Sequence, residues 1–293
     1  MRYTQVIITL LIYCCTFPLS ASAAVWISQW RAPDPQSGVR LESVLAMVFD
    51  PQRERIYVAD GLAGKLHAFD LDGQHLSDFD AGGDLGTPVS ITLQRTGRFW
   101  FVDRKANALV RLVPEEQRLE RFPFSLTGAE AMLPEKVVWH PEAGLMVLDR
   151  LSGNVLALDD NLNVRGRYGS NCIDVVSAAG KLWILQADAS VVQVDPSDAS
   201  ESKGKRIALQ YDLKRPSALE RSPQGQLFIA DRGLCQVLVF SPAGRHLYSI
   251  GARGNRLGRF SAPRQILFLD SAQGSGALAV LDEVNRCVDL FRR

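Results

Sequence analysis

The sequence predicts an all-β protein built from six repeats of one four-stranded unit. A phrase recurs six times: an apolar run, an aspartate in five of the copies, and a second apolar run that begins six residues later. The anchor residues of the phrase lie 43, 46, 37, 45 and 51 residues apart. A period in the forties with short β-rich runs is typical of propeller blades, so we expect a six-bladed β-propeller. The anchors are Asp60, Asp103, Asp149, Gln186, Asp231 and Asp282.

Each repeat is expected to contribute four strands. The innermost is a mostly apolar run, such as residues 89–93 or 265–269, as expected for a strand covered on both faces. The second strand ends at the anchor, and the third begins six residues after it. The fourth is a weaker run, such as residues 74–79 or 245–250, and turn dipeptides such as Asp-Gly separate the runs.

Closure of the ring requires a strand from elsewhere in the chain. Repeat six ends at Arg293, directly after its third strand, and an incomplete sheet would leave an unpaired edge. Residues 25–30, VWISQW, have the pattern of a strand that belongs to no other repeat. We therefore predict that this N-terminal strand completes blade six and closes the ring.

The repeated aspartates are predicted to be structural. A carboxylate that opens a turn can accept hydrogen bonds from backbone N–H groups two residues on, and so close the turn. Although five aspartates in a ring resemble a metal site, each belongs to a different blade, and we predict no metal site there. The predicted turn residues are Asp60, Asp103, Asp149, Asp231 and Asp282.

Residues 1–23 have the pattern of an export signal. A positive start at Arg2 is followed by an apolar run over residues 6–15, and Ala21-Ser22-Ala23 is a small-residue cleavage pattern. The run is shorter than the roughly 20 residues that span a bilayer. We expect a mature chain of residues 24–293 that is one domain, periplasmic or secreted, and not inserted in a membrane. An uncleaved anchor and lipid attachment at Cys14 or Cys15 are the alternatives.

Charge and cysteine content exclude several classes of protein. The chain has 33 basic and 32 acidic residues, whereas a nucleic-acid binder needs a basic surface to neutralise phosphates. Cys172, Cys235 and Cys287 remain after cleavage, an odd number that does not indicate a disulfide scaffold. Cys235 and Cys287 occupy corresponding turns of neighbouring repeats; they either pair or are free thiols, and we expect free thiols.

The joint between repeats five and six resembles a known repeat family. Residues 251–263 read GARGNRLGRFSAP, and residues 282–291 read DEVNRCVDLF. This closely resembles the NHL repeat, in which spaced glycines, a Phe and a Pro precede an apolar strand, Asp-x-x-Asn and a strand ending in Phe. Repeats one and five match well, repeats two and three moderately, and repeat four departs at Gln186. The resemblance covers essentially the whole mature chain and implies the fold rather than the activity.

NHL-like and related six-bladed propellers include protein-binding and RNA-binding scaffolds, a zinc-dependent amidating lyase, metal-dependent lactonases and strictosidine-synthase-like proteins. Such enzymes would need metal ligands that converge on the central channel. The four histidines fall in different kinds of strand and turn, and we expect that they do not meet. The Glu and Asn set of the lactonase group and a Ser-His-Asp arrangement are not found, so no cofactor, metal or catalytic residue is predicted. The histidines are His67, His75, His140 and His246.

Alignment of the inner strands places one side chain per blade at the channel mouth, with Glu135, Lys136, Asp174, Arg264 and Gln265 as the candidate binding residues. Two interpretations remain open, because these groups either pair with one another and fill the pore or hold a small polar ligand or cation. The aligned residues are Ala46, Ser90, Lys136, Asp174, Ala218 and Gln265, preceded by Leu45, Val89, Glu135, Ile173, Ser217 and Arg264.

A glycine-rich loop carries Arg253, Arg256 and Arg259 on the same face as the aspartate turns. It is either a solvated, mobile connector or a surface that grips an acidic partner, since arginine is enriched at interfaces. We predict an exported binding or scaffolding module whose partner is another exported or envelope protein that docks on this face. The alternative is a metal-dependent lyase or lactonase with its site at the channel mouth.

Overall fold

The computed structural model describes residues 26–34, 36–113, 118–125, 131–197, 204–269 and 276–293. The export signal predicted for residues 1–23 lies outside the described residues. Within them, no helix is long and apolar enough to cross a membrane. The one helical segment described is a short 3-10 turn, η1 (Ala81–Gly83).

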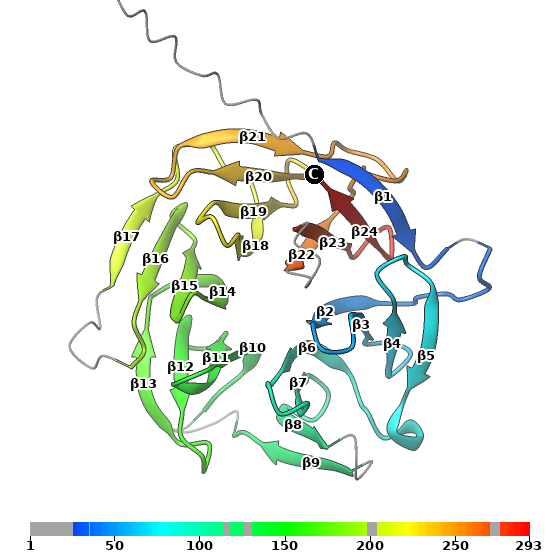
Figure 1. Ribbon diagram of the computed structural model, residues 1–293. Helices are drawn as coiled ribbons and strands as arrows, with labels where there is room; N and C mark the ends of the chain where they lie inside the picture. The colour runs from blue at the N-terminus through cyan, green and yellow to red at the C-terminus, as the bar shows by residue number, and fades with distance from the viewer. Residues whose placement is uncertain (1–25, 35, 114–117, 126–130, 198–203, 270–275) are drawn as a thin grey trace, which may run out of the picture.

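The described chain forms six four-stranded antiparallel sheets arranged in a ring, a six-bladed β-propeller (Figure 1). Blade one is β2 (Val44–Asp50), β3 (Arg55–Asp60), β4 (Lys65–Phe69) and β5 (His75–Phe79). Blade two is β6 (Pro88–Leu93), β7 (Phe99–Asp103), β8 (Ala108–Val113) and β9 (Arg118–Pro123). Blade three is β10 (Pro134–His140), β11 (Gly144–Asp149), β12 (Asn154–Leu158) and β13 (Val164–Tyr168).

The other three blades repeat this order, with the first strand nearest the axis of the ring (Figure 1). Blade four is β14 (Cys172–Ala178), β15 (Lys181–Gln186), β16 (Ser190–Val194) and β17 (Lys205–Ala208). Blade five is β18 (Pro216–Arg221), β19 (Leu227–Asp231), β20 (Gln236–Phe240) and β21 (His246–Ile250). Blade six is β22 (Pro263–Leu269), β23 (Ala277–Asp282), β24 (Cys287–Arg292) and β1 (Ile27–Ala32).

The ring is closed by the N-terminal strand, which confirms the prediction. β1 pairs antiparallel with β24, from Ile27 opposite Arg292 to Ala32 opposite Val288. The indole of Trp26, just before β1, packs edge-on against Phe228 of blade five at 5.9 Å between ring centroids. The first described residues and the last strand therefore share one sheet, so no blade is left with a missing outer strand.

The hydrophobic core consists of clusters between neighbouring blades. The middle strands β7, β11, β19 and β23 are almost wholly buried, because both of their faces meet an adjacent sheet. The outer strands are more exposed, and this difference explains why their sequence pattern is weaker. The repeat thus encodes a ring in which every sheet needs its neighbours to bury its apolar faces.

Candidate functional site

The anchor aspartates are buried and join two loops of their own blade. Asp60 Oδ1 accepts hydrogen bonds from the N–H of Leu62 at 3.2 Å and of Ala63 at 3.1 Å, within the turn that follows. The same oxygen accepts from Ser43 N–H at 3.0 Å, in the loop that enters the inner strand. The turn carboxylates therefore hold the entrance of each inner strand in place. Asp103, Asp149, Asp231 and Asp282 make the corresponding bonds.

Side chains on the inner strands bond the backbone of the next blade. Asp174 Oδ2 in β14 accepts from Leu219 N–H in β18 at 2.7 Å. Gln265 in β22 accepts from Met47 N–H in β2 at 2.7 Å and donates to Met47 O at 2.8 Å. The inner strand is an edge strand, and these side chains satisfy backbone groups that the sheet leaves unpaired.

One pocket of about 260 Å³ opens where the inner strands begin, on the face of the aspartate turns; we call it the channel mouth. It is lined by all the side chains that the alignment placed there except Ala218. The structure thus brings together Glu135, Lys136, Asp174, Arg264 and Gln265, and adds Arg215 and Arg232.

The carboxylates of blades three and four at the mouth are paired with cations. Lys136 Nζ lies 2.6 Å from Asp174 Oδ1, and both side chains are largely buried. Glu135 Oε2 lies 3.2 Å from Arg104 and 3.4 Å from Arg150. This side of the mouth therefore matches the interpretation in which the charges pair with one another.

The opposite side of the mouth has an excess of arginine. Glu283 Oε2 lies 2.8 Å from Arg232 and 3.2 Å from Arg264, so one carboxylate serves two guanidinium groups. Arg264 Nε also donates to Leu45 O at 2.7 Å, which joins blade six to blade one. Arg215 also lines the pocket, and its guanidinium has no hydrogen bond or ion pair to the described residues.

Sequence reasoning missed Arg215, which precedes the inner strand of blade five, and four charged residues that line the site or pair with its lining. Arg104, Arg150, Arg232 and Glu283 each directly follow an anchor aspartate. Because the aspartate fixes the turn, the next residue occupies the same place in every blade, beside the start of the inner strand. The charge of the residue after each anchor could therefore have been used to predict the charged groups beside the mouth.

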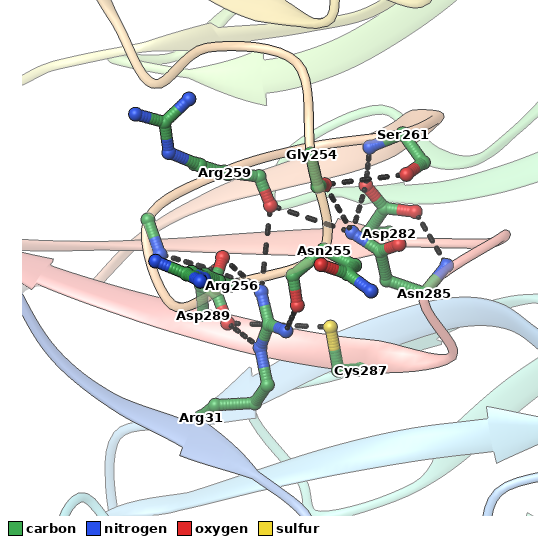
Figure 2. Close-up of polar contacts among 11 residues, drawn as sticks. Arg31, Gly254, Asn255, Arg256, Arg259, Ser261, Asp282, Asn285, Cys287 and Asp289 are labelled. Atoms are coloured by element: carbon green, nitrogen blue, oxygen red, sulfur yellow. Dashed lines mark hydrogen bonds and ion pairs between the residues drawn. The ribbon is translucent and has the colours of Figure 1, made fainter.

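The loop that carries Arg253, Arg256 and Arg259 is bonded to the rest of the protein through its backbone (Figure 2). Arg31 of β1 lies beneath it and donates to the carbonyl oxygens of Asn255 and Arg256. Its guanidinium also pairs with Asp289 in β24, at 2.6 Å from Nε to Oδ1. The three arginines themselves are exposed.

Two of these three side chains also bond the loop region. Arg253 donates to Gly233 O at 3.1 Å, in the aspartate turn of blade five, and Arg259 donates to Arg253 O at 3.3 Å. The loop is thus fastened to the face that carries the aspartate turns. For the Arg256 guanidinium, no polar contact to the described residues is found.

The expectation that the histidines do not meet is wrong for two of them. His67 in β4 and His75 in β5 both lie against Asp78, with ring nitrogens 2.8 and 2.6 Å from Asp78 Oδ1. Adjacent strands of a blade bring them together, because β4 and β5 pair so that His67 is opposite Asp78. They lie on the outer part of blade one, away from the channel mouth. His140 and His246 lie in blades three and five.

The residues of the channel mouth do not fit a divalent metal ion. Its carboxylates Glu135 and Asp174 are each engaged by lysine or arginine, and no described histidine lines it. A cation among these groups would have to displace existing positive charges. The metal-ligand sets that the sequence resemblance implied are therefore not matched at this mouth.

The three described cysteines are free. Cys235 and Cys287 are buried, and burial raises the pKa of the Cys172 thiol to about 11. A thiol with a raised pKa is protonated at neutral pH and is a weak nucleophile. The Cys172 thiol therefore lacks the activation that a catalytic cysteine needs.

Comparison with solved structures finds the same architecture in proteins of different function. A gluconolactonase from Xanthomonas campestris matches with a TM-score of 0.66 at 12% identity, over 86% of this chain and 86% of that chain. Virginiamycin B lyase from Staphylococcus aureus matches with a TM-score of 0.60 at 11% identity, over 89% and 82%. An auxiliary nutrient binding protein from Bacteroides ovatus matches with a TM-score of 0.61 at 15% identity, over 86% and 69%.

These likenesses establish the fold alone. No family model and no curated protein matches the sequence. The chain is a six-bladed β-propeller whose structural neighbours include lyase, lactonase and nutrient-binding proteins. Membership of the NHL family stays a prediction from the repeat pattern.

Proposed function

We propose that this protein is an exported binding module whose channel mouth receives an acidic group of its partner, another exported or envelope protein. The observation that carries the proposal is the surplus of positive charge at the mouth. Four basic and two acidic side chains line the mouth, and two further arginines and one glutamate form ion pairs with them. The residues are Arg104, Lys136, Arg150, Arg215, Arg232 and Arg264, with Glu135, Asp174 and Glu283.

The arginines of the mouth keep hydrogen-bond donors that an incoming anion can use. Arg232 and Arg264 share one carboxylate, so each retains N–H groups that can bind an incoming carboxylate. The Arg215 guanidinium has no ion pair to the described residues that such a ligand would have to displace. The pocket is small enough for one side chain or a small anion rather than a large organic ligand.

The rest of the docking surface would come from the same face. The Arg253 guanidinium bonds the blade-five aspartate turn, so the arginine loop borders this face. Because the loop backbone is already fastened by Arg31, a partner would not have to order it on binding. The partner's acidic group at the mouth and contacts with Arg256 would together give specificity.

The enzymatic alternative has less support at this mouth. A lyase or lactonase of the metal-dependent kind needs free carboxylates or histidines that converge on one point. The described carboxylates at and beside this mouth already form ion pairs with lysine or arginine. This arrangement of charges supports specific binding rather than bond cleavage.

The test compares two charge-matched double variants of the tagged full chain after gentle cross-linking and mass spectrometry. Arg215→Ala with Arg232→Ala changes the mouth, whereas Arg95→Ala with Arg98→Ala changes the opposite face, at the hairpin between β6 and β7. We expect a stoichiometric partner that is lost only from the mouth variant, with cross-links near the mouth. A partner retained equally by both variants, or the absence of any partner, would overturn the proposal.

A further inference from the structure

The outer part of blade one holds a triangle of two histidines and one aspartate. The donor atoms of His67, His75 and Asp78 all lie within 4.8 Å of one another. His67 is buried, while His75 and Asp78 are partly open to solvent, with side-chain exposures of 22% and 37%. The three residues come from the paired strands β4 and β5, so a rigid sheet positions them.

The buried ring of His67 lies between two carboxylates. Its Nδ1 is 2.8 Å from Asp78 Oδ1, and its Nε2 is 3.9 Å from Asp60 Oδ2. A neutral imidazole has one N–H and one lone pair, so one of its nitrogens would direct a lone pair at a carboxylate oxygen. A metal ion at Nδ1 combined with an N–H at Nε2 would let both ring nitrogens face a carboxylate favourably.

Asp60 gives the arrangement a feature of metal sites. Histidines that bind a metal through one nitrogen usually present the other N–H to a carboxylate, which fixes the tautomer and the ring orientation. His67 Nε2 is buried without a hydrogen-bond partner, and the nearest carboxylate is that of Asp60. An N–H at Nε2 would leave the Nδ1 lone pair free to bind a metal on the side of Asp78.

Blade five shows what the repeat looks like without this cluster. His246 begins β21 as His75 begins β5, and each is paired opposite the last phenylalanine of the preceding strand. At the other two places blade five has Leu238 opposite Ser249, where blade one has His67 opposite Asp78. Neither the fold nor the outer-strand histidine therefore requires the extra histidine and carboxylate.

We propose that blade one binds a divalent transition-metal ion, such as Zn²⁺, through His67 Nδ1, His75 Nε2 and a carboxylate oxygen of Asp78. Imidazole nitrogen and carboxylate oxygen are ligands of Zn²⁺, at about 2.0–2.2 Å. Lys65 Nζ lies 3.7 Å from the other carboxylate oxygen, Oδ2, and so leaves Oδ1 to the two imidazoles. The exposed side of His75 and Asp78 leaves the fourth coordination position to water.

The test is titration of Zn²⁺ alone into the tag-free full chain by calorimetry, with bound zinc counted after gel filtration. We expect one equivalent in the wild type and an affinity at least about tenfold weaker in His75→Ala and in Asp78→Ser. His246→Ala is the matched control and is expected to bind as the wild type does. Wild-type binding below one equivalent, unchanged affinity in both blade-one variants, or an equal loss in His246→Ala would overturn the proposal.

A gain of binding gives a second readout. Leu238→His with Ser249→Asp copies the blade-one residues into blade five, beside His246. We expect the zinc content of this folded variant to rise to two equivalents, and bound Co²⁺ to show the visible absorption of a tetrahedral site. A content that stays at one equivalent would count against the three-residue ligand set.

Discussion

Lys136 of blade three and Asp174 of blade four form an ion pair at the channel mouth, 2.6 Å from Nζ to Oδ1. The other carboxylate oxygen of Asp174 accepts from Leu219 N–H in blade five, so one side chain links three blades. Asp174 therefore stabilises the ring, and its negative charge is already compensated by Lys136. In the proposed function, the part of the mouth that recognises an anion is the arginine side, around Arg215.

Asp174→Ala is therefore expected to weaken folding but not partner binding. The substitution removes the acceptors for Leu219 N–H and for Lys136, at a cost of about 2–3 kcal/mol in the free energy of unfolding. It also removes a negative charge from the mouth, which should not weaken an acidic partner. Urea unfolding and partner cross-linking measure the two effects. Stability equal to the wild type, or loss of the partner from folded protein, would contradict this account.

Arg31→Met is expected to loosen ring closure. Arg31 is the cation beside Asp289, a carboxylate whose side chain is 1% exposed, and it also holds the loop carbonyls (Figure 2). Burial raises the pKa of Asp289 even though Arg31 opposes this effect. Removal of one partner of such a pair should cost about 3 kcal/mol in urea unfolding. Lys214→Met, in an exposed pair with Asp212, should cost less than about 1 kcal/mol.

Gly86→Ala tests the packing of the turn carboxylate in blade two. Gly86 has φ +75°, and an added Cβ would lie 2.2 Å from Asp103 Oδ2. Gly82 also has positive φ, at +71°, but an added Cβ meets nothing within 4 Å. Gly82→Ala should cost about 1 kcal/mol for the backbone alone, and Gly86→Ala clearly more. Equal losses in thermal unfolding would mean that the carboxylate can move without penalty.

Glu220 should make stability depend on pH. It lies partly buried in β18, and desolvation of its carboxylate raises its pKa to about 7, above the usual value of 4.5. The folded state therefore binds this proton more tightly than the unfolded state does. The contribution of the protonated Glu220 carboxyl to the free energy of unfolding is fully present below the pKa of the unfolded state. It is lost as the pH rises through about 7.

The measurement is urea unfolding of the wild type and Glu220→Gln at several pH values from 4.5 to 8. Glutamine cannot titrate, so the stability of the variant relative to the wild type should increase as pH rises through this interval. A constant difference between the two proteins across the interval would show that Glu220 does not have the raised pKa.

Many residues of the channel mouth could be predicted because the anchor residues recur at the same place in every repeat and so fix the alignment of the inner strands. Counting back from Asp149 and Asp231 placed residues such as Lys136 and Ser217 at the mouth, where the structure has them. Arg215 and Arg232 were missed, since they precede the inner strand or follow the anchor and become neighbours only when loops of one blade meet at the axis.

The His67–Asp78 contact was missed for a different reason. His67 and Asp78 are 11 residues apart, and their contact depends on a register shift at Phe69 between β4 and β5. A shift of one residue would place Asp78 on the other face of the sheet. Sequence spacing alone does not reveal such an irregularity.

By itself the sequence determined the six repeats, the four strands of each and the N-terminal strand that closes the ring. These follow from apolar periodicity and turn chemistry, which act over a few residues and recur in every copy. Only the tertiary structure decided which charges are compensated, that the Arg253 loop is fastened by Arg31, and that His67 and His75 share Asp78. Those contacts join different strands or blades, and their geometry depends on the closed ring and on strand register.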